Sequence, residues 1–150
     1  MNHKLKLCFL PLIAFMTSCK PQAGSSSSID YEIMERQSIS WAECLSQTEP
    51  QYLVFFHSNT CASCQEIKGG VVSFATSNIV KTYFVDIDKP GNEIQKCSVD
   101  EIVVGADRIE DFYIAGTPTI VEVENGRTTV NAAGKSKCLE LLETLKNPQS

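Results

Sequence analysis

Residues 52–64 read YLVFFHSNTCASC, and this stretch decides how the chain folds. The apolar run 52–56 has the pattern of a buried strand, and two cysteines, Cys61 and Cys64, follow it three positions apart. At a junction between a strand and a helix, such a pair can close a small disulfide. The first thiol then lies at the helix N-terminus, where free N–H groups and the helix dipole favour a thiolate. Because the thiolate is the species that attacks disulfides, the stretch indicates redox chemistry at Cys61 and Cys64.

A second motif lies downstream, where residues 116–119 read GTPT and precede the strand-like run 120–124 and an Asn-Gly turn. Another strand-like run, 83–88, separates the two motifs. In this order the elements resemble the thioredoxin superfamily over roughly residues 41–146. The resemblance implies an α/β thioredoxin fold, with a central mixed sheet of four or five strands and helices on both faces.

The resemblance also implies roles for individual residues. Cys61 attacks a substrate disulfide, and Cys64 resolves the mixed disulfide that results. Pro118 is cis and packs beside the cysteine pair, so that Thr117 exposes its backbone to an extended substrate. The implied activity is thiol–disulfide oxidoreduction on protein or peptide cysteines, with an unidentified redox partner and neither a dissociable cofactor nor a metal.

Three positions depart from the thioredoxin pattern. Many members carry a buried Asp six residues before the first cysteine, where this chain has Phe55, and the lysine often paired with that Asp aligns with Phe84. The Trp that commonly precedes the first cysteine is Thr60 here. Proton transfer to or from Cys64 must therefore use water or another group.

Other chemistries use the same cysteine spacing. A zinc site usually takes its ligands as two close pairs, whereas Cys44, Cys97 and Cys138 are scattered singly. Haem attachment requires a histidine directly after the second cysteine, and Gln65 stands there. A permanent structural disulfide remains open as a third use of the pair.

The alternative function is a non-catalytic thioredoxin-fold binding module that handles copper. It would use Cys61, Cys64 and His57, since thiolates and imidazole suit that metal. The family position of His57 commonly holds a packing residue, so we assign this histidine no catalytic role.

The N-terminus has the features of an export signal. Lys4 and Lys6 precede an apolar stretch, 7–16, that is too short to span a bilayer and suits a signal peptide. The signal ends in MTSC, which resembles a bacterial lipobox, so we expect 1–18 to be removed and Cys19 to receive a lipid. An ordinary secretory signal cleaved near Ser18 is the other interpretation.

The expected protein is exported to the cell envelope and anchored in a membrane, facing the periplasm or another extracytoplasmic space. Residues 19–30, which are polar and rich in serine, would form a flexible tether. The thioredoxin-like domain would span 31–150, with an insertion around 89–105 relative to short thioredoxins.

Periodicity predicts the remaining elements. Residues 29–37 are ambiguous between an edge strand and a lead-in to the fold. We expect strands over 51–57 and 79–88 and helices over 41–47, 61–75, 100–112 and 135–146. Ser40 would cap the first of these helices, and Gly69 and Gly70 would weaken or bend the second. The resemblance places the first and third of these helices on one face of the sheet and the last on the other, which favours a Cys44–Cys97 disulfide and leaves Cys138 in the core.

Composition narrows the class of partner. The chain of 150 residues is 43% hydrophobic, which suits one globular domain. Without residues 1–18, which hold two of the 13 basic residues and none of the 18 acidic ones, the formal net charge falls from −5 to −7. No basic run remains, so the sequence gives no support for nucleic-acid binding.

Lipidation at Cys19 can be tested by metabolic labelling with palmitate. We expect the wild-type protein to take up the label and the Cys19→Ala variant to lose it, because only the first residue of the processed chain would carry the lipid. Unchanged labelling of the variant, or a mature N-terminus at another residue, would remove the lipoprotein assignment.

Overall fold

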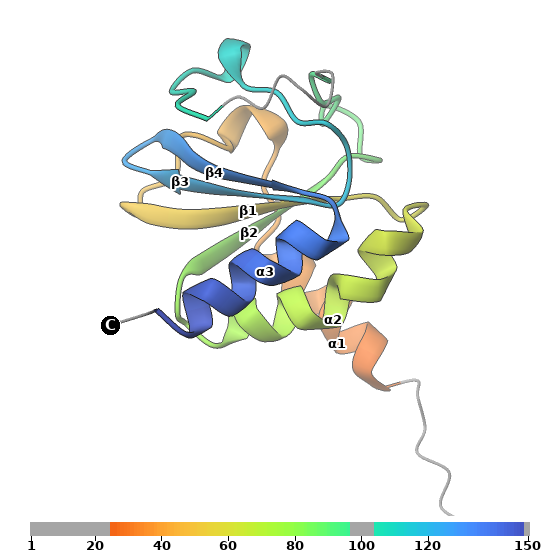
Figure 1. Cartoon of the computed structure of the whole chain (residues 1–150). Helices are drawn as coiled ribbons and strands as arrows, with labels where there is room; N and C mark the ends of the chain where they lie inside the picture. The colour runs from red at the N-terminus through yellow and green to blue at the C-terminus, as the bar shows by residue number, and fades with distance from the viewer. Residues whose placement is uncertain (1–24, 97–103, 149–150) are drawn as a thin grey trace, which may run out of the picture.

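The computed structural model describes residues 25–96 and 104–148, which form one sheet with helices packed against it (Figure 1). The sheet has four strands in the order β2-β1-β3-β4. In chain order the elements are α1 (Ser25–Arg36), η1 (Trp41–Glu43), β1 (Gln51–His57), α2 (Ala62–Thr76), β2 (Lys81–Asp86), η2 (Ile109–Asp111), β3 (Thr119–Glu124), β4 (Arg127–Ala133) and α3 (Lys135–Lys146), where η marks a short 3₁₀-helix.

The sheet is mixed, as predicted. β1 pairs in parallel with β2 and antiparallel with β3, and β3 pairs antiparallel with β4 across a tight turn at Asn125 and Gly126. In this register His57 lies opposite Asp86 on β2, and Phe56 lies opposite Thr119 on β3. The C-terminal ends of β1 and β2 and the start of β3 therefore meet at one edge of the sheet.

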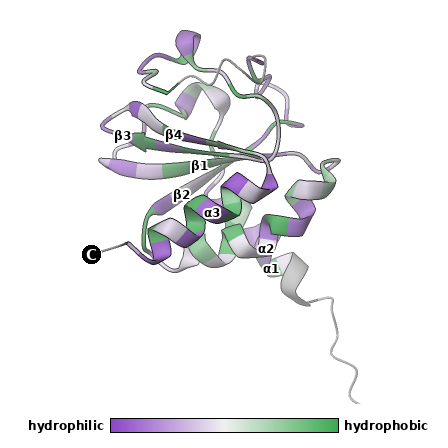
Figure 2. Cartoon of the chain, viewed as in Figure 1, coloured by the Kyte–Doolittle hydropathy of each residue, from purple (hydrophilic) through white to green (hydrophobic). Residues whose placement is uncertain are grey.

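The three α-helices lie together on one face of the sheet (Figure 1). α2 packs against both α1 and α3, and its buried residues join those of the strands in one core, which includes Leu53, Phe55, Phe74, Phe84 and Cys138. Figure 2 shows that hydrophobic and hydrophilic residues alternate along the α3 ribbon. The buried residues of α3, Cys138 and Leu142, belong to the core beneath the sheet. α2 continues through Gly69 and Gly70 without a break, and the bend expected there stays a prediction.

The opposite face of the sheet is covered by η1 and by the segment that follows β2. Trp41 stacks on Phe112 with ring centroids 4.9 Å apart, and both are buried with Tyr52, Val54 and other strand residues. η1 is a single turn rather than the expected helix over 41–47, but Ser40 does begin it, with its N–H donating to the Glu43 carboxylate at 2.8 Å. The two faces thus carry helices as predicted, with 3₁₀-helices on this one.

The helix predicted over 100–112 is wrong for the residues that the structure describes there, 104–112. Only Ile109–Asp111 are helical, and they form one 3₁₀ turn. Gly105 donates its N–H to the carbonyl of Thr128 at 2.8 Å, and Ala106 accepts from the N–H of Thr128 at 2.9 Å. The backbone of this segment thus bonds to the edge of β4, so the apolar side chains reach the core without forming a helix.

The N-terminal part of the described chain is helical. α1 begins at Ser25, so residues 25–30 of the stretch predicted to be a tether belong to a helix, and so does most of the ambiguous stretch 29–37. Cys19 and the predicted signal peptide, 1–18, lie outside the described residues. Within the described ranges, no helix is long and apolar enough to cross a membrane.

Ile120 and Ile79 offer a matched test of the core. Ile120 on β3 is fully buried, whereas Ile79 is 46% exposed. We expect Ile120→Ala to lower the free energy of unfolding by about 2–5 kcal/mol, because it removes buried apolar volume, and Ile79→Ala to change it by less than about 0.5 kcal/mol. Urea denaturation of both variants measures the difference, and equal losses would contradict the fold.

Candidate active site

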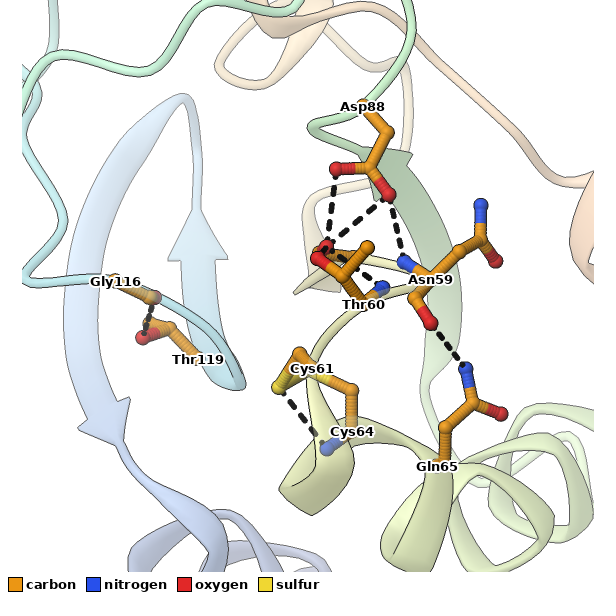
Figure 3. The surroundings of a disulfide bond; sticks show 9 residues. Asn59, Thr60, Cys61, Cys64, Gln65, Asp88, Gly116 and Thr119 are labelled. Atoms are coloured by element: carbon orange, nitrogen blue, oxygen red, sulfur yellow. Dashed lines mark hydrogen bonds between the residues drawn. A yellow bond between two sulfur atoms is a disulfide. The ribbon is translucent and has the colours of Figure 1, made fainter.

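The cysteine pair lies where the sequence predicted it, at the start of α2 just beyond β1 (Figure 3). Cys61 and Cys64 form a disulfide with their Cα atoms 5.2 Å apart. Cys61 is the N-cap of α2, with extended backbone, and its Sγ accepts the backbone N–H of Cys64 at 3.1 Å. In the reduced protein the same N–H and the helix dipole would favour a thiolate on Cys61.

The two sulfurs differ in their access to solvent. Cys61 is half-buried, whereas Cys64 is 2% exposed and lies in the first turn of α2. A substrate can therefore reach Cys61 directly, but it can reach Cys64 only through Cys61.

The loop that carries Pro118 faces the disulfide. Figure 3 shows Gly116 and Thr119 on the side of the cysteine pair opposite α2, although the two motifs are far apart in the sequence. The Thr117–Pro118 bond is cis, which confirms the prediction. Pro118 is buried and its carbonyl accepts the N–H of Gly134 at 2.8 Å, while the hydroxyl of Thr119 donates to the carbonyl of Gly116 at 2.8 Å.

Thr117 is the free part of this loop. Thr117 is half-buried and makes no hydrogen bond with the described part of the chain. Its backbone N–H and C=O are therefore available to a ligand. The structure thus places Thr117 and Pro118 at the same edge of the sheet as Cys61 and Cys64.

Beneath the cysteine pair the core is apolar. Phe55 and Phe84, the residues that replace the Asp and Lys of many thioredoxins, lie directly opposite each other on β1 and β2. Both are buried, and their rings meet edge to face with centroids 6.2 Å apart. The two positions therefore exchange a charged pair for an aromatic contact and offer no group that could accept a proton.

His57 is a packing residue. It is 8% exposed and its imidazole stacks on Phe55 with ring centroids 5.6 Å apart. Burial lowers the pKa of His57, although Asp86 and Asp88 oppose this shift. The ring is therefore neutral at pH 7 and supplies no positive charge to a thiolate.

The structure does not support the copper-handling alternative. No group of three or more His, Cys, Asp or Glu side chains in the described ranges is placed to hold a metal ion. Cys61 and Cys64 are bonded to each other in this structure, so the copper-handling alternative stays a prediction.

Four polar residues that the sequence did not single out fix the loop before Cys61 through hydrogen bonds. Ser58 donates its hydroxyl to the Asp88 carboxylate at 3.0 Å, and Asn59 donates its N–H to the same carboxylate at 2.7 Å. Asp86 accepts from the Asn59 side chain at 3.2 Å. The sequence placed Asp86 and Asp88 at the end of the predicted strand 79–88, but it did not predict their contacts with the loop before Cys61.

The other two cysteines in the described ranges do not belong to the site. Cys44 and Cys138 carry free, buried thiols in the two separate cores. Burial raises the pKa of both, for Cys138 to about 11, so neither is a thiolate at neutral pH. Cys97, the expected partner of Cys44, lies outside the described residues.

Comparison with known proteins identifies the fold. No model of a known protein family matches the chain, and no curated protein matches its sequence. Among solved structures, mitochondrial thioredoxin 3 from Saccharomyces cerevisiae in its oxidised form is 12% identical, with a TM-score of 0.55 over 79% of this chain and 98% of that one. The reduced thioredoxin pre-protein from Schistosoma mansoni is 17% identical, with a TM-score of 0.51 over 73% of this chain and 94% of that one. Together with the mixed four-stranded sheet, these similarities show a thioredoxin fold.

Proposed function

We propose that this thioredoxin-fold protein is a thiol–disulfide oxidoreductase that acts on protein or peptide cysteines through Cys61 and Cys64. One observation carries the proposal: the half-exposed Cys61 caps the N-terminus of α2 and is bonded to a buried Cys64. A permanent structural clip would need neither the helix cap nor the difference in exposure. Reversible exchange needs both, because the attacking sulfur must be accessible to the substrate and the resolving sulfur must lie next to it, out of the substrate's reach.

The reaction proceeds in two exchanges. In the reduced protein the Cys61 thiolate attacks one sulfur of a substrate disulfide, an S–S bond forms between Cys61 and the substrate, and the other substrate sulfur leaves as a thiolate. The Cys64 sulfur, once deprotonated, then attacks Cys61 and releases the second substrate sulfur. The substrate disulfide has gained two electrons and two protons and become a dithiol, and the protein, which supplied them, is left with its Cys61–Cys64 disulfide. The same steps in reverse oxidise a substrate dithiol.

Thr117 is the docking point for the substrate backbone. Its unpaired N–H and C=O lie on the loop that faces the disulfide, so an extended peptide can bond to them as a short added strand. Pro118, which lacks an N–H, leaves no unsatisfied donor in the buried part of this loop. The contact selects backbone rather than side chains, which fits a protein that accepts more than one cysteine-containing substrate.

The Cys64 proton has no acceptor at the positions of Phe55 and Phe84. Both rings are buried and apolar, so water is the acceptor in this proposal. Loss of two buried charges also leaves the disulfide in a less polar environment than in thioredoxins that carry them.

The proposed compartment follows from the N-terminal sequence. Lys4, Lys6 and the apolar stretch 7–16 support export, and the MTSC ending supports attachment of a lipid to Cys19. The protein would then act at the outer side of a membrane, in an oxidising environment, and a dithiol or disulfide partner protein would exchange electrons with Cys61 and Cys64 after each turnover.

Trapping of mixed disulfides tests the proposed exchange. We expect Cys64→Ser to accumulate covalent adducts with disulfide-bonded peptides, because the thiolate of the accessible Cys61 attacks the peptide disulfide and no second thiol then releases the mixed disulfide. Cys61→Ser is the matched control and should form none, since Cys64 is 2% exposed. Wild-type protein should reduce insulin with dithiothreitol as electron donor.

Two results would contradict the function. Equal trapping by both variants would mean that the sulfurs are not ordered as attacking and resolving groups. An absence of both trapping and insulin reduction in the folded protein would leave the disulfide as a structural clip.

A further inference from the structure

The loop that leads from β1 to Cys61 is held by two carboxylates, of which Figure 3 shows Asp88. The hydroxyl of Ser58 donates to both oxygens of Asp88, at 3.0 and 3.1 Å, and the Asn59 N–H donates to Asp88 Oδ2 at 2.7 Å. Asp86 stands behind them, accepting from the Asn59 amide at 3.2 Å and from the Asp88 N–H at 3.0 Å. Hydrogen bonds to ionised acceptors are stronger than those between neutral groups, so this arrangement fixes the loop.

Ser58 relays this contact toward the cysteines. Its Oγ accepts the Thr60 N–H at 3.1 Å and lies 2.9 Å from the Thr60 hydroxyl, and its carbonyl accepts the Cys61 N–H at 3.3 Å. Ser58 is 5% exposed, so water does not compete freely for these bonds. The backbone of Cys61 therefore takes its position from Ser58, and Ser58 takes its position from Asp88.

The position matters because Cys61 must cap α2. Its Sγ accepts the Cys64 N–H at 3.1 Å only while its backbone is extended and correctly aimed. A looser loop would let the Cys61 sulfur turn away from the free N–H groups of the helix, and these groups are what favours the thiolate.

We propose that Asp88 is a positioning residue for Cys61, acting through the hydroxyl of Ser58 to hold the attacking sulfur on the N-terminal cap of α2. The role of this positioning in disulfide exchange rests on the function proposed above. The negative charge of Asp88 acts against this positioning effect, because a carboxylate near a thiolate disfavours the thiolate. Three hydrogen bonds of Asp88 tie down the loop, so in this proposal the positioning effect exceeds the repulsion.

The rate of Cys61 alkylation by iodoacetamide tests the proposal on the full chain. The Cys64→Ser background leaves Cys61 as the reactive thiol of the pair, and Cys44 and Cys138 are buried. Peptide mass spectrometry follows alkylation at Cys61 alone and separates it from reaction at the cysteines outside the described residues. We expect Asp88→Asn and Ser58→Ala each to slow alkylation at pH 7 by about tenfold, the scale expected for loss of a charge-assisted hydrogen bond, and to move the pH–rate profile to higher pH. The double variant should be no slower than the singles, since both break one path.

Asp111→Asn is the control for the change from carboxylate to amide. Asp111 is exposed on η2, where it pairs with Arg108. We expect the alkylation rate of Cys61 in the Asp111→Asn variant to stay within about twofold of the rate in the Cys64→Ser protein without this change. Thermal melts of each variant show that the alkylated protein is folded. Ser58→Ala keeps both carboxylates, so it carries the test alone if Asp88→Asn does not fold.

Several outcomes would overturn the proposal. Faster alkylation of Asp88→Asn would mean that repulsion dominates. Unchanged rates in folded variants, even with lower melting temperatures, would mean that Asp88 only stabilises the fold. Because alkylation requires no protein substrate, these results are independent of insulin reduction: a protein that responds in this assay but reduces no disulfide would keep the positioning role and lose the proposed function.

Discussion

The pairing of β1 on both of its edges is the constraint on which the rest of the structure depends. β1 is the strand between β2 and β3, and the register brings the ends of all three to one edge of the sheet. That edge gathers Cys61 from the loop after β1, Asp88 from the loop after β2, and Pro118 from the loop before β3. A shift of one residue in either pairing would turn Phe55 to the other face and separate these groups. The site is therefore a consequence of strand register rather than of any one loop.

The interior beneath the site distinguishes this protein from a thioredoxin with a buried Asp and Lys. Phe55 and Phe84 occupy facing positions, and His57 packs against both rings as a neutral side chain. The carboxylates of the site lie instead at its rim, where Asp88 is exposed and bonds to the loop before Cys61. The two buried positions on β1 and β2 are thus apolar, and Asp88 places its carboxylate against the loop before Cys61.

Local sequence was enough to predict the strand before Cys61 and the hairpin after Pro118, because an apolar run and an Asn-Gly turn mark them. The cis bond at Pro118 was predicted from the resemblance to the thioredoxin superfamily. The helix predicted over 100–112 was wrong for residues 104–112, because apolar residues at helical spacing can also cover a sheet from an irregular segment. The N–H of Gly105 donates to Thr128 on β4 and not to a carbonyl within a helix. The sequence could not predict the contact between Ser58 and Asp88. These residues lie in two loops 30 residues apart, and their hydrogen bond forms only when β1 and β2 are paired.

The central claim is that the Cys61–Cys64 disulfide is a reversible two-electron centre, and equilibration with glutathione tests it most directly. The wild-type protein would be incubated over a range of reduced-to-oxidised glutathione ratios, quenched in acid, and its Cys61–Cys64 pair quantified by mass spectrometry. The account predicts a single transition that fits two electrons, is the same from the oxidised and the reduced side, and leaves the protein folded throughout. A disulfide that persists at every ratio, or that reduces only as the fold is lost, would contradict it.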